Sequence, residues 1–139
     1  MKYYHKKRLL KLADFLENLP RENFDLNTWW SPAQSHVNNF TKFKKNPHFC
    51  GTTACAAGWA CTIPSFKRAG LTVKTTSIAG QFEPAFKKYR AFSALEDFFG
   101  IDDYQARQLF ESGYYMFPHD GPRNVSNRIR KLVKTGRAL

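Results

Sequence analysis

Long hydrophobic runs and a disulfide framework are both missing from this chain of 139 residues. No apolar run reaches the roughly 18 residues that a membrane-spanning helix needs, so we expect no contact with a membrane. The basic N-terminus lacks the apolar stretch and the cleavage site of a signal peptide. There are three cysteines, an odd and closely spaced set, which disfavours a secreted disulfide scaffold. We therefore expect a cytoplasmic protein with reduced thiols.

Acidic residues are scarce, and both ends of the chain lack them. Eleven Asp and Glu stand against 22 Lys and Arg, a formal net charge of +11. Residues 1–11 carry +5 and residues 121–139 carry +6, whereas the 109 residues between them hold 11 bases and 11 acids. Such an excess attracts polyanions, although a charged surface that only aids solubility is the simpler interpretation. The candidate polyanion-binding residues are Lys6, Lys7, Arg8, Arg123, Arg128, Arg130, Lys131 and Lys134.

Bulky side chains are almost absent from residues 50–61, Cys-Gly-Thr-Thr-Ala-Cys-Ala-Ala-Gly-Trp-Ala-Cys, in which only Trp59 is large. A helix of small residues lets neighbouring backbones approach closely, so it is buried for its shape. The segment predicts a central helix from about Thr53 to Cys61, with Thr52 or Thr53 as its N-cap and Pro64 closing it.

Hydrophobic periodicity predicts four further helices, over residues 3–19, 91–99, 103–112 and 122–134. Gly100 ends one of them and Pro122 begins another. Residues 67–84 mix glycines with β-branched residues, which predicts either a short β-hairpin near 70–83 or an irregular segment. The expected fold class is therefore mainly α: a single domain, residues 1–139, of about five helices around the central helix.

Four potential metal ligands, His48, Cys50, Cys55 and Cys61, fall within fourteen residues. Zinc sites use more closely spaced pairs, and Cys55 and Cys61 would lie about 120° apart around a helix, so we expect no metal and no cofactor. Cys50, just before the expected helix, is the best candidate for a nucleophilic thiol, with His48, His36 or His119 as a base. No signature of a cysteine enzyme flanks it, and a thiol that only packs is the simpler interpretation.

The start of the expected central helix is also a candidate site for a phosphorylated ligand. Gly51, Thr52 and Thr53 would offer backbone N–H groups and hydroxyls, and Lys44 and Lys45 precede them. Ordinary helix capping is the simpler interpretation of the threonines, and the glycine-rich loop of nucleotide-binding proteins is missing.

Residues 98–107 have the helix–Gly–helix rhythm of a helix-turn-helix. The second helix begins with Asp102 and Asp103, which would face phosphates, so a sequence-specific DNA reader is disfavoured. Nonspecific contact through the C-terminal helix is the better interpretation.

The order of these motifs resembles a family of small, largely uncharacterised bacteriophage and prophage proteins. The resemblance rests on Leu12-Ala13-Asp14-Phe15-Leu16, on a Cys-Gly-Thr-x-x-Cys-Ala-x-Gly-Trp core at residues 50–59 and on Phe98-Phe99-Gly100-Ile101. It implies a phage origin, a helical fold and action in the host cell cytoplasm, and it brings no catalytic residue with it.

Together these features predict a non-enzymatic phage accessory protein that binds a polyanion, either a nucleotide signal or a nucleic acid. Its role would be to counteract or redirect a host process such as antiviral defence. The alternative is an inhibitor that binds a host protein, and the third is an enzyme that uses Cys50 or a histidine.

Overall fold

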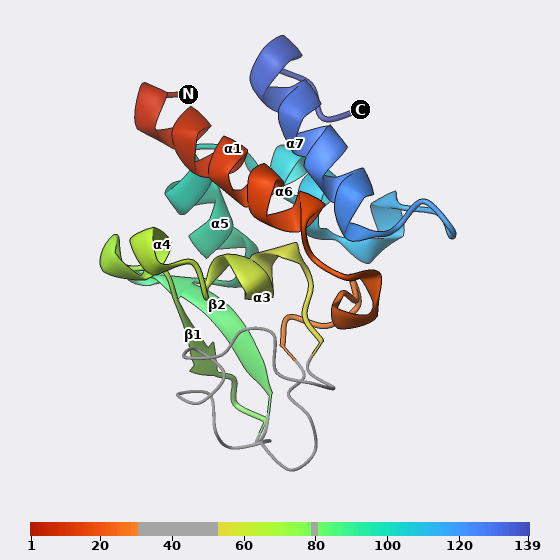
Figure 1. The fold of residues 1–139 in the computed structure, drawn as a ribbon. Helices are drawn as coiled ribbons and strands as arrows, with labels where there is room; N and C mark the ends of the chain where they lie inside the picture. Colours follow the sequence, from red (N-terminus) through yellow and green to blue (C-terminus); the bar gives the residue numbers. More distant parts are fainter. Residues whose placement is uncertain (31–52, 79–80) are drawn as a thin grey trace.

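The computed structural model describes residues 1–30, 53–78 and 81–139. Within these ranges the chain forms six α-helices and a three-stranded antiparallel sheet (Figure 1). The α-helices are α1 (Tyr3–Glu17), α3 (Ala56–Ala60), α4 (Pro64–Arg68), α5 (Ala91–Phe99), α6 (Asp103–Phe110) and α7 (Pro122–Thr135). Two short 3-10 helices, η1 (Arg21–Asn23) and η3 (Ser112–Tyr114), lie in the connections.

The four amphipathic helices lie where the hydrophobic periodicity predicts them, with ends that differ by at most two residues. The hairpin predicted near residues 70–83 is also confirmed, but the sheet is larger. Strand β1 (Thr72–Thr75) pairs with β2 (Phe82–Phe86), which pairs with β3 (Tyr89–Arg90). The description as mainly α is therefore confirmed only in part: helices pack with a small antiparallel sheet.

The central helix differs most from its prediction. It begins at Ala56, with Cys55 as N-cap, and spans only five residues. The predicted caps Thr52 and Thr53 are therefore wrong. Ala54 pairs with Phe24 in an isolated β-bridge, because the chain here is extended and tied to the segment after η1. Pro64 follows the helix as expected, but it is also the first residue of α4. At this position a backbone N–H would have no partner within the helix, so its absence in proline costs no hydrogen bond.

The helix α3 lies at the centre of the hydrophobic core, as its small side chains predict. All five of its residues are buried. Trp59 is fully buried, and its indole N–H donates to the Asn23 carbonyl at 2.8 Å. Around α3 the buried side chains of α1, α5, α6, α7 and the sheet join in one hydrophobic cluster.

Gly58 lets two backbone segments touch inside this core. A Cβ atom at position 58 would stand 1.7 Å from the Trp29 carbonyl oxygen and 2.9 Å from the Ala54 Cβ. No real contact is that short, so any side chain must push two backbone segments apart.

We predict that Gly58→Ala lowers the free energy of unfolding by at least about 2 kcal/mol, because overpacking outweighs the gain in helix propensity. Chemical denaturation monitored by circular dichroism measures the change. Gly113→Ala is the matched control, since a Cβ there meets nothing within 4 Å. Equal stability of the two variants would contradict the close approach at Gly58.

Candidate nucleic-acid interface

Helices α1 and α7 lie side by side, so the two basic ends of the chain meet on one side of the molecule. Both termini lie at the same end of the helix pair, which makes the two helices antiparallel (Figure 1). Val125, Ile129 and Leu132 of α7 are buried in the core. The Ser126 hydroxyl donates to the Ala13 carbonyl of α1 at 2.9 Å. The patch expected from the two ends therefore has a common location.

One of the predicted patch residues, Arg128, is used to hold the fold together. Its guanidinium donates to the carbonyl oxygens of Gln108 (2.9 Å) and Tyr114 (2.5 Å). It also lies 3.6 Å from the centre of the Tyr115 ring. These contacts join α7 to α6 and η3 and leave few donors for a ligand.

Arg130 and Arg8 are committed in the same way. Arg130 donates from Nη2 to Asp14 at 2.5 Å and from Nε to Glu17 at 2.8 Å, and these hydrogen bonds raise the pKa of Arg130. Arg8 donates to the Phe98 carbonyl at 2.8 Å, with its guanidinium 4.1 Å from the Phe98 ring centre. The guanidinium groups of Arg8, Arg128 and Arg130 therefore serve tertiary contacts, which leaves them fewer donors for a ligand.

The other five predicted patch residues are exposed. They are Lys6, Lys7, Arg123, Lys131 and Lys134. Within the part of the chain that the structure describes, none of the five forms an ion pair. Helix α7 contains no acidic residue. Their charge therefore stays available to a partner in solution.

The three cations on α7 form a row on its outer face. Arg123, Lys131 and Lys134 lie within about 80° of one another around the helix and opposite the buried Val125 and Ile129. At 1.5 Å per residue the row is about 17 Å long. The exposed basic residues at the two ends of the chain also include Lys2, Lys11 and Arg137. They belong to the same charged ends of the sequence, although they were not singled out as ligand-binding residues.

The candidate phosphate site at the start of the central helix falls mostly outside the described residues, which include neither Lys44, Lys45, Gly51 nor Thr52. Thr53 is described and is half-buried. The next two backbone amides are occupied: Ala54 donates to Asn23 (3.3 Å) and Cys55 donates to Thr28 (2.8 Å). The amides of Ala54 and Cys55 are therefore not open to a ligand.

The described cysteines are packing residues. Cys55 is fully buried, and burial raises the pKa of its thiol to about 11 against the opposing effect of the Ala57 and Gly58 amides. Cys61 is buried too and donates to the Ala57 carbonyl at 3.4 Å. Both thiols are therefore inaccessible, and the raised pKa of Cys55 keeps that thiol protonated near neutral pH.

The candidate nucleophile Cys50 and the candidate bases His48 and His36 lie outside the described residues. His119 is described and exposed. Among the described residues, no three His, Cys, Asp or Glu side chains come close enough to hold a metal ion.

The structure confirms the predicted order of helix, Gly100 and helix, but the second helix is not arranged to read bases. Gly100 joins α5 to α6 in the left-handed conformation (φ 66°). Arg107 pairs with Asp103 at 3.1 Å, and Gln108 is buried. The Gln105 side chain accepts a hydrogen bond from the backbone amide at the start of α6. The polar groups that a DNA reader would need are therefore engaged within the protein.

No helix in the described ranges is long and apolar enough to cross a membrane. Comparison with known proteins adds nothing to this geometry: no family model, curated protein or solved structure matches the chain. Functional inference therefore rests on the positions of the chain's own residues.

We predict that Arg128→Lys lowers the free energy of unfolding by about 1–3 kcal/mol, because lysine keeps the charge but cannot bridge two carbonyls and stack on Tyr115. Thermal and chemical unfolding measure the loss. Arg123→Lys, at an exposed position of the same helix, should unfold like the parent. If the two variants were equally stable, the assignment of Arg128 to the fold would be wrong.

Proposed function

We propose that this protein binds nucleic acid through the outer face of α7 and the adjoining start of α1. One observation carries the proposal: the three exposed cations Arg123, Lys131 and Lys134 line the outer face of α7, and none of them forms an ion pair among the described residues. The contacts are with phosphates, because the polar side chains of α6 that could read bases are engaged internally.

The shape of the charged surface favours a polymer over a single nucleotide. A row of cations about 17 Å long matches a backbone that carries one phosphate every 3.4 Å or so along each strand. A lone nucleotide would require a compact cluster of donors around one or two phosphates. A nucleotide signal is therefore the less favoured form of the expected polyanion.

A non-enzymatic role agrees with the chemistry of the described residues. The thiols of Cys55 and Cys61 are buried, and the exposed charged side chains of α7 are all cations. Binding alone can block or redirect a process that acts on nucleic acid. The resemblance of the central motif to phage proteins makes an encounter with host antiviral defence the setting that we propose for this binding.

A second candidate is the inhibition of a host protein, favoured by a groove between α1 and α4. The groove has a volume of about 730 Å³. Leu10 and Phe66 supply part of its apolar lining, and Lys7 and Lys11 supply positive charge. A partner for this groove would present an apolar and acidic surface.

Removing the α7 cations should weaken binding and reduce its dependence on salt. In Arg123→Gln/Lys131→Gln/Lys134→Gln, we expect at least a tenfold loss of affinity for a duplex of about 20 base pairs at low salt. The slope of log K against log salt should fall by up to about 2.7, since each lost phosphate contact removes about 0.9. Fluorescence anisotropy over a salt series measures both quantities.

The matched control removes three exposed cations elsewhere, in Arg68→Gln/Lys74→Gln/Lys88→Gln. Both triple variants lose three charges from the formal +11, so net charge alone predicts equal losses. Equal losses would contradict a localised interface on α7. Absence of binding by the parent protein at low salt would contradict the proposed function itself.

A further inference from the structure

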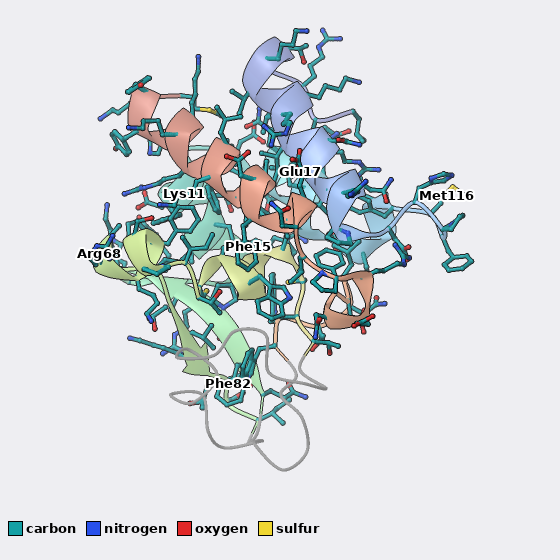
Figure 2. All side chains as sticks on the ribbon, in the orientation of Figure 1. Lys11, Phe15, Glu17, Arg68, Phe82 and Met116 are labelled. Carbon is teal, nitrogen blue, oxygen red and sulfur yellow. The ribbon has the colours of Figure 1, made fainter. Side chains whose placement is uncertain are left out.

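The loop between η3 and α7 holds two large apolar side chains in water. Met116 is 81% exposed and Phe117 is 83% exposed. Figure 2 shows Met116 pointing away from the molecule, on a loop that extends beyond the start of α7. Single exposed apolar residues are common, but two adjacent large ones on a projecting tip are typical of a binding element.

The tip is carried by a well-fixed base. Tyr115, directly before it, is buried; its hydroxyl donates to a backbone carbonyl of α6 at 2.8 Å, and Arg128 stacks on its ring. After the tip, Asp120 pairs with Arg21 at 2.5 Å. The backbone on each side of the tip is therefore held to the rest of the protein, so the loop itself needs less ordering on binding.

The tip leads directly into the basic helix. Gly121 is the N-cap of α7, Pro122 is its first residue, and Arg123, the first cation of the row, is its second. A partner that contacts both surfaces must be negative on its outside and apolar within. A DNA duplex meets this requirement, because its phosphates surround a stack of flat bases.

We propose that Met116 and Phe117 form a wedge that enters between base pairs of a DNA duplex whose backbone lies along α7. Proteins that bend DNA insert Phe, Met and similar side chains between base steps in this way and kink the duplex. The inference rests on the proposed nucleic-acid binding and names its substrate, double-stranded DNA deformed at the contact.

Two other partners fit the tip less well. Proteins that lie in a lipid surface bury a broad apolar face, whereas here only two neighbouring side chains project. Single-stranded nucleic acid is bound on aromatic platforms along a groove, whereas Met116 and Phe117 share one narrow turn. Insertion between base pairs, in contrast, needs only a small apolar tip of the kind that Met116 and Phe117 form.

The test uses a duplex that carries 2-aminopurine, whose fluorescence rises when its neighbours unstack. The parent protein should bind at low salt and raise this fluorescence. Met116→Ser/Phe117→Ser should lose the rise and about tenfold in affinity, while retaining the salt dependence that α7 supplies. Ile78→Ser is the control, because Ile78 is a large apolar residue that is 58% exposed in the connection between β1 and β2, on a different element from the tip. It should behave like the parent.

Each other outcome is decisive. Binding of the parent without any rise in fluorescence would overturn the wedge and leave the proposed function standing. Binding and a rise in fluorescence that both survive in Met116→Ser/Phe117→Ser would also overturn it. The third contradicting outcome concerns a lipid surface as the partner. If Met116→Ser/Phe117→Ser bound the duplex like the parent but lost binding to vesicles of phosphatidylserine and phosphatidylcholine, the wedge would also be overturned. Failure of the parent to bind the duplex at all would instead remove the proposed function.

Discussion

The pairing of α1 with α7 is the constraint on which the account of this molecule depends. The entire excess of positive charge lies at the two ends of the sequence. It is concentrated in one part of the molecule only because the end helices α1 and α7 pack against each other. The pairing is directional, since Arg130 reaches across to Asp14 and Glu17, and Ser126 bonds the Ala13 backbone. Like charges brought together repel one another, so the packing of α1 and α7 on the core must offset that repulsion.

Within the basic ends, arginines and lysines have different roles. Arg8, Arg128 and Arg130 each make contacts that suit a planar, multidentate guanidinium: carbonyl pairs, carboxylates and aromatic faces. The exposed lysines on the same two helices make no ion pair among the described residues. The positive surface thus combines arginines that position the helices with lysines, joined by Arg123, that remain accessible.

The sequence predicts those features of the fold and of the site that depend on nearby residues, and it fails for those that depend on residues far apart in the chain. Amphipathic helices were found because the periodicity of Leu9, Leu12 and Leu16, or of Val125 and Ile129, reports a buried face directly. The start of α3 was misplaced because Thr53 resembles a helix cap locally, whereas Ala54 and Cys55 bond to distant backbone near η1. In the sequence alone, the charge of Arg128 favours a ligand-binding role. Its partners, the carbonyl oxygens of Gln108 and Tyr114, come close to it only in the folded chain. The exposure of Met116 and Phe117 could not be predicted from the sequence, because the type of a residue does not determine whether it is exposed.

The central claim is that the outer face of α7 contacts nucleic acid. Its most direct test is the rate of lysine acetylation, measured by mass spectrometry with and without a saturating DNA duplex. The account predicts that DNA slows acetylation of Lys131 and Lys134 several-fold and leaves Lys74 and Lys88, which are exposed on and beside the sheet, unchanged. Protection spread equally over all four lysines, or confined to the sheet, would contradict it.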